Sequence, residues 1–175
     1  MGKRHYMCAC IAAAMLCACG RAPVREPPAP ARAWGNTAPA DPAAANAVLM
    51  RAISLVGTPY RYGGSTPEGG FDCSGLVNYV YRDMLDLRLP RTSRQLSEYQ
   101  GPRIEPGHLA PADLVFFGSG GQVSHVGIYV GEGRFVHAPS TGGTVRLDRL
   151  DGAWWRDHYT GARRVLDPAG VDAGS

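Results

Sequence analysis

Three residues of the sequence, Cys73, His125 and His137, have side chains that could together carry out nucleophilic catalysis. A cysteine thiolate is a strong nucleophile, and a histidine can take the thiol proton near neutral pH. Apolar residues recur at helical spacing after Cys73, and Asp72 is placed to cap a helix that begins there. Because unpaired N–H groups at a helix start stabilise negative charge, we predict a thiol of lowered pKa.

The two histidines lie in predicted neighbouring strands joined through residues 131–133. Glycine at both ends of that segment favours a three-residue loop, which would pair Val130 with Arg134. In that register His125 and His137 are diagonal neighbours on one face of the hairpin, about 7 to 8 Å apart at Cα. A two-residue turn would place them on opposite faces. The pattern therefore predicts a nucleophile, a base and an orienting residue.

Each of these residues also has a plainer interpretation. An isolated cysteine is often a small buried hydrophobe, and a single histidine is often a hydrogen-bonded structural residue. A metal site formed by Cys73, His125 and His137 is the chemical rival, but the sequence lacks close ligand spacing such as CxxC or HExxH.

Hydrophobic periodicity predicts helices followed by strands. We expect an α+β fold in which N-terminal helices pack on a C-terminal antiparallel sheet of about five to six strands, because the strand connections are too short for parallel crossovers. The glycine- and proline-rich segment 58–70 is expected to be irregular, and Trp154 and Trp155 to be packing residues. The predicted helices cover residues 44–56, 73–85 and 93–99, and the predicted strands 114–117, 125–130, 134–138, 144–147 and 162–166.

Charge and composition narrow the class of partner. The formal net charge is +3, and residues 1–45 carry all of that excess. A basic groove for nucleic acid is therefore not expected on the remaining chain. The size suits one domain, which we place at residues 46–166, followed by a flexible tail at 167–175. We expect a monomer.

The first residues of the chain resemble a bacterial lipoprotein signal. Lys3 and Arg4 precede an apolar run that is too short to span a bilayer. The run ends in Leu-Cys-Ala-Cys, which is similar to a lipobox, so we expect a signal peptide at 1–18 and lipid modification of Cys19. The Pro/Ala-rich residues 19–45 would form a linker to the lipid anchor. The alternative is a secretory signal without lipidation, in which Cys19 is incidental. With Cys19 acylated, Cys73 is the one free thiol of the mature protein.

Six short motifs, in order and at sensible intervals, together resemble the NlpC family of papain-like peptidoglycan endopeptidases. The arrangement of signal, linker and single domain is most similar to the small outer-membrane murein endopeptidase lipoproteins. The motifs are GTPYRYGG (57–64), FDCSGLV (71–77), LPRTS (89–93), DLVFF (113–117), HVGIYVG (125–131) and FVHAP (135–139).

The resemblance implies a role for each residue of the candidate site. Cys73 would be the nucleophile, His125 its base and His137 the residue that orients the base. Tyr60 would assist the oxyanion together with the backbone N–H groups of Cys73 and Ser74. Tyr62 is the alternative tyrosine.

The resemblance also implies a reaction, a substrate and a location. The reaction would be amide hydrolysis through a thioester, without a cofactor. The substrate would be a peptidoglycan stem peptide, cut between D-glutamate and diaminopimelate or at a D,L or D,D cross-link. The protein would lie in the periplasm, anchored to the outer membrane through Cys19.

Two other functions use a related core. An acyltransferase or lipase of the lecithin-retinol type is disfavoured because its histidine precedes its cysteine, whereas here Cys73 precedes His125. A non-catalytic wall-binding lipoprotein is disfavoured by the complete Cys/His/His set.

Overall fold

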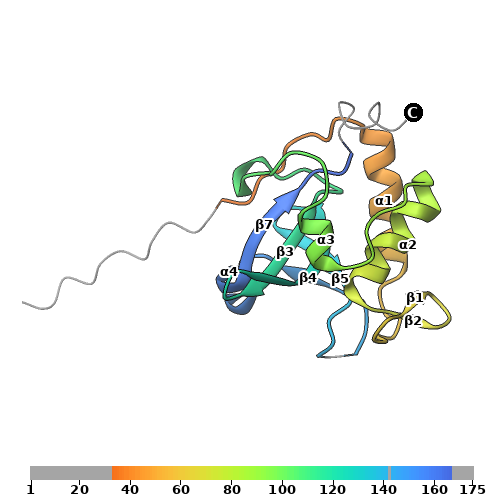
Figure 1. Cartoon of the computed structure of the whole chain (residues 1–175). Coiled ribbons are helices and arrows are strands. Elements are labelled where there is room, and N and C mark those ends of the chain that lie inside the picture. Colours follow the sequence, from red (N-terminus) through yellow and green to blue (C-terminus); the bar gives the residue numbers. More distant parts are fainter. Residues whose placement is uncertain (1–32, 142, 167–175) are drawn as a thin grey trace, which may run out of the picture.

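The computed structural model describes residues 33–141 and 143–166 of the chain. Two helices, α1 (Pro42–Ser54) and α2 (Cys73–Leu85), lie side by side and pack on a five-stranded antiparallel sheet (Figure 1). The predicted α+β architecture of helices followed by an antiparallel sheet is confirmed. The strand order is β6-β5-β4-β3-β7, and the strands are β3 (Leu114–Ser119), β4 (Gln122–Gly131), β5 (Arg134–His137), β6 (Arg146–Arg149) and β7 (Tyr159–Arg163).

Aspartates cap the starts of both long helices. Asp41 and Asp72 each accept a hydrogen bond from the N–H three residues further on, at 3.0 and 2.7 Å. Helix α2 has the bounds predicted from the sequence, and α1 begins and ends two residues before the predicted range 44–56. The third predicted helix is present as α3 (Ser93–Ser97), which packs near β4.

The sequence analysis missed several short elements. The segment expected to be irregular contains two-residue strands, β1 (Ser65–Thr66) and β2 (Gly70–Phe71), which pair with each other. Helix α4 (Ala153–His158) was not predicted because Gly152 precedes it and no side chain caps its first turn. Strand β7 follows this helix directly and begins at Tyr159, before the predicted strand 162–166. A 3₁₀ helix, η1, spans Pro106–His108.

The hairpin between β4 and β5 has a different turn from the one predicted. Its turn contains two residues, Glu132 and Gly133, with φ of 52° and 70°, and not three. A β-bulge at Val130 adds one residue to β4, so that Ile128 pairs with Val136. This is the register that the predicted loop would have produced, so the two histidines remain on one side of the hairpin.

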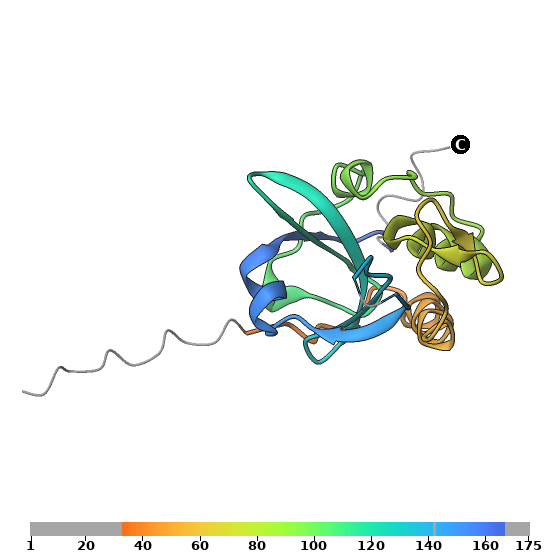
Figure 2. The same ribbon diagram turned by 90° about the horizontal axis from the view of Figure 1, so that it is seen from below.

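Two hydrophobic cores hold the fold together. The first fills the space between the helices and the sheet and includes Val77 and Ile128. The second, on the other face of the sheet, includes Phe117 and Phe135, and Trp155 from α4 packs against it. Figure 2 shows the strands curving around this side of the molecule. The sheet therefore has apolar packing on both faces.

Residues 33–41 pack on the domain, although the sequence analysis assigned them to the linker. The N–H of Gly35 donates to the Pro106 carbonyl at 2.7 Å, and the N–H of Thr37 donates to the Leu109 carbonyl at 2.9 Å. The rings of Trp34 and Tyr159 meet edge to face at 5.1 Å. The packed part of the chain thus begins before the predicted boundary at residue 46.

Several predictions lie outside the described residues: the signal at 1–18, Cys19, the first part of the linker and the tail at 167–175. Within residues 33–141 and 143–166, no helix has the length and apolar character needed to cross a membrane.

Candidate active site

The thiol of Cys73 lies where the start of α2 meets β4. Cys73 is the first residue of the helix, is partly buried, and is a free cysteine. The backbone N–H groups of Cys73, Ser74 and Val126 are directed at its sulfur. Because Val126 follows His125 directly in β4, the sulfur lies beside the backbone of that histidine. The structure therefore brings together the helix and the strand that the sequence analysis selected.

Burial raises the pKa of the Cys73 thiol above its ordinary value. The three N–H groups act in the opposite direction, but the carboxylate of Asp72 adds to the increase. The sequence analysis expected a lowered pKa from the helix start, and that expectation was wrong because it omitted the cost of removing the sulfur from water. A raised pKa favours the protonated thiol at neutral pH.

The two histidines and an aspartate form a hydrogen-bonded chain. Nε2 of His125 lies 2.8 Å from Nδ1 of His137, and Nε2 of His137 lies 3.0 Å from Oδ2 of Asp148. A carboxylate can only accept, so Nε2 of His137 carries the proton and its Nδ1 accepts from Nε2 of His125. Nδ1 of His125, the ring nitrogen nearer the backbone, then keeps a free lone pair. This arrangement leaves His125 able to accept a proton at Nδ1.

Both imidazoles are held neutral. Burial lowers the pKa of His125 to about 3, and the charges of His137 and Arg146 act in the same direction. Burial also lowers the pKa of His137 to about 4, although its hydrogen bond to Asp148 partly opposes this. These pKa shifts favour a neutral thiol and neutral imidazoles over a thiolate–imidazolium pair at neutral pH.

Asp148 is the functional residue that the sequence analysis missed. Burial alone would raise the pKa of its carboxyl group, but hydrogen bonds and charges from His137 and Arg146 hold that pKa below the ordinary value. Trp155 also donates to Oδ2, from Nε1 at 3.0 Å. The predicted strand 144–147 ended one residue before Asp148. In the observed register Asp148 lies opposite Phe135, diagonally across from His137.

Trp155 packs against both imidazoles. Its ring centroid lies 4.7 Å from that of His137 and 5.5 Å from that of His125. The sequence analysis read Trp155 as a packing residue, and it packs here on the histidines as well as on the second core.

Among the described residues, no group of three His, Cys, Asp or Glu side chains is arranged to hold a metal ion.

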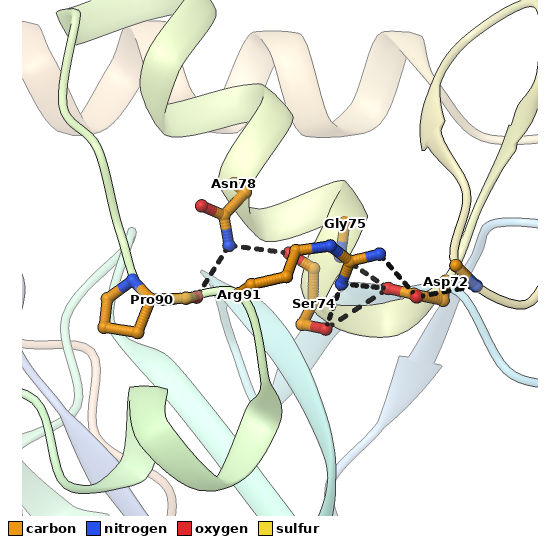
Figure 3. A network of polar contacts seen from close by, with 7 residues as sticks. Asp72, Ser74, Gly75, Asn78, Pro90 and Arg91 are labelled. Carbon is orange, nitrogen blue, oxygen red and sulfur yellow. Dashed lines mark hydrogen bonds and ion pairs between the residues drawn. The ribbon is translucent and has the colours of Figure 1, made fainter.

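A polar network fixes the first turn of the thiol-bearing helix (Figure 3). Arg91, from the LPRTS motif, contacts both carboxylate oxygens of Asp72 at 2.9 and 2.7 Å and donates to Oγ of Ser74 at 2.8 Å. Nearby, Asn78 donates to the Pro90 carbonyl at 2.8 Å. Burial would raise the pKa of Asp72, but Arg91 and the Gly75 N–H lower it. Asp72 is thus an ionised cap held by a bidentate arginine.

The structure distinguishes the two candidate tyrosines. Tyr60 is partly buried, and burial together with the charges of Cys73 and Asp72 raises the pKa of its hydroxyl. The side chain of Tyr62 is open to solvent, with 89% of the residue exposed. Tyr60 is therefore the better placed of the two to act near the thiol.

Comparison with known proteins shows clear relatives. A model of the NlpC/P60 family matches residues 57–164. The murein DD-endopeptidase MepH of Escherichia coli K12 is 42% identical over 128 residues, which are 71% of this chain and 47% of the relative. The probable endopeptidase NlpC of the same strain is 46% identical over 111 residues, 62% of this chain and 70% of the relative.

The fold also matches solved structures. The NlpC/p60 domain of the peptidoglycan hydrolase SagA superposes with a TM-score of 0.61 at 32% identity, covering 69% of this chain and 97% of that domain. Among the curated relatives, the chain spans about half the length of MepH.

The neutral resting state predicts how the thiol reacts with alkylating agents. In the full chain, alkylation of Cys73 by iodoacetamide should be slow at pH 6 and should increase with pH beyond 8.5, because burial raises the thiol pKa. The rate is measured by mass spectrometry of the peptide that contains Cys73.

His125→Ala provides the comparison, and His108→Ala, which changes an exposed histidine outside the site, is the matched control. At pH 6 all three proteins should react at similarly low rates. Fast alkylation of the parent at pH 6 that His125→Ala abolishes would show an ion pair and contradict the neutral state.

Proposed function

The chain belongs to the NlpC/P60 family, and on that basis we propose that it is a cysteine-type endopeptidase that hydrolyses amide bonds in peptidoglycan stem peptides. One observation carries the proposal: backbone N–H groups surround the Cys73 thiol, one of them from Val126, directly after His125 in β4, and the chain through His137 to Asp148 leaves Nδ1 of His125 free. The names of the two relatives, a murein DD-endopeptidase and a probable endopeptidase, support the same class of reaction.

In the first half of the proposed reaction, Nδ1 of His125 takes the proton from Cys73 as the sulfur attacks the scissile carbonyl. The oxyanion that forms is stabilised by the N–H groups of Cys73 and Ser74 and by the Tyr60 hydroxyl. The C–N bond then breaks, and His125 returns its proton to the leaving amine. This step leaves the acyl half of the peptide on Cys73 as a thioester.

In the second half, His125 takes a proton from water, and the resulting hydroxide attacks the thioester carbonyl. The C–S bond breaks, the proton passes from His125 to the sulfur, and the acyl product leaves as a carboxylic acid. His137 and Asp148 act as positioning residues, because they keep Nδ1 of His125 unprotonated between these steps. No cofactor takes part in this scheme.

The bond that we propose is either that between D-glutamate and diaminopimelate or a D,L or D,D cross-link. To identify it, the protein is incubated with defined muropeptides and the products are read by mass spectrometry. We expect cleavage at one of these bonds.

Cys73→Ala should abolish cleavage while shifting Tm by only a few degrees. Asp148→Asn should reduce kcat on the order of 10²-fold or more, because an amide at this position no longer fixes the proton of His137 on Nε2. His108→Ala is the control that should retain the parental rate. If the parent cuts none of the muropeptides, the proposed function is wrong; if Cys73→Ala still cuts, the nucleophile is misassigned.

For the location of the protein we propose the periplasm, with lipid modification of Cys19 anchoring it to the outer membrane. The support is the lipobox-like sequence that ends at Cys19 and the Gly20 that follows it. A linker reaching from Cys19 to the packed residues would hold the active site close to the cell wall, which raises its effective concentration there.

Replacement of the lipidated residue tests the anchor. In bacteria expressing the full chain, Cys19→Ser should move the protein from the membrane fraction to the soluble fraction, because the acyl chains are lost. Cys17→Ser, one of the cysteines before the proposed cleavage site, is the matched control and should stay with the membranes. Continued sedimentation of Cys19→Ser with membranes would rule out this anchor.

A further inference from the structure

A cleft opens at His125, which lines it together with Trp155. Its volume is about 560 Å³, and its walls include Ser124, Pro139, Ser140, Arg146 and Trp154. Trp154 is 52% exposed although it is a large aromatic residue. Arg146 is the one cation among the lining residues, and none of them is acidic. The cleft therefore combines an apolar wall, hydroxyl groups and a positive charge.

Arg146 uses only one edge of its guanidinium group for structure. Its Nε and Nη2 both contact Oδ2 of Asp148, at 3.0 Å each. The structure records no partner for Nη1 within the described part of the chain, and 41% of the side chain is exposed. A guanidinium held on one edge and open on the other can bind a second carboxylate with little loss of side-chain freedom.

The chemistry of the reaction determines which half of the substrate occupies this cleft. His125 donates the proton to the leaving amine, so that amine must lie within hydrogen-bond reach of the imidazole. The acyl carbonyl lies on the other side, against the N–H groups at the start of α2. Since His125 itself lines the cleft, the amine half of the substrate extends into it.

We propose that Arg146 binds a free carboxylate on the amine half of the scissile bond, with Trp154 covering the apolar part of that residue. The inference rests on the proposed function and adds a substrate preference to it. At the D-glutamate bond and at the D,D cross-link the amine half is diaminopimelate, which keeps a free carboxylate on its D centre. The cleft thus selects the acid form of diaminopimelate over the amidated form.

The test compares two muropeptides that differ only in a carboxylate or a carboxamide at the D centre of diaminopimelate. The parent should cut the acid with a kcat/KM about 10- to 100-fold higher, as expected for one charge-assisted hydrogen-bonded pair. Arg146→Gln should cut both substrates at the same rate. Arg149→Gln is the matched control, because Arg149 lies on the same strand and also pairs with an aspartate two residues further on, so it should retain the preference.

If Arg146→Gln has lost all activity, its substrate preference is measured by binding. In the Cys73→Ala background, calorimetry should show tighter binding of the acid muropeptide, and Arg146→Gln should remove that difference. If Arg146→Gln lowers kcat/KM equally for both muropeptides and so keeps the preference for the acid, Arg146 only positions Asp148 and the inference fails. If the parent cuts both forms equally, the inference fails while the proposed function stands; if it cuts neither, both fail.

Discussion

The hydrogen-bonded chain of the candidate active site depends on a single carboxylate oxygen. Oδ2 of Asp148 accepts hydrogen bonds from His137, Arg146 and Trp155. Because the carboxylate can only accept, it fixes the proton of His137 on Nε2, and this in turn fixes the proton of His125 on Nε2. Asp148 therefore sets the protonation of the proposed base, His125, through His137.

The start of α2 holds the proposed nucleophile, Cys73. The carboxylate of Asp72 caps α2, and the bidentate contact with Arg91 fixes this cap. Burial raises the pKa of the thiol and lowers the pKa values of both imidazoles, which favours the neutral form of each group. In the proposed reaction, charge develops only as the sulfur attacks, when the N–H groups at the helix start can stabilise it. A site of this kind favours the transition state over a charged ground state.

Sequence reasoning could predict the parts of the site that depend on local rules. The aspartate cap located the start of α2 at Cys73, and the parity of the hairpin placed the two histidines on one face, even though a bulge at Val130 and not a longer loop produces that register. Asp148 and Trp155 could not be found in this way. Their positions depend on the pairing of β6 with β5 and on an uncapped helix, and neither leaves a local signal.

The protonation states of His125 and His137 test the central claim most directly. Long-range ¹H–¹⁵N correlation spectra of the imidazoles at pH 7 report which ring nitrogens carry a proton. The account predicts two neutral rings, each protonated on Nε2. A cationic His125, or a neutral His125 protonated on Nδ1, would contradict it, because Nδ1 could then no longer accept the proton of Cys73.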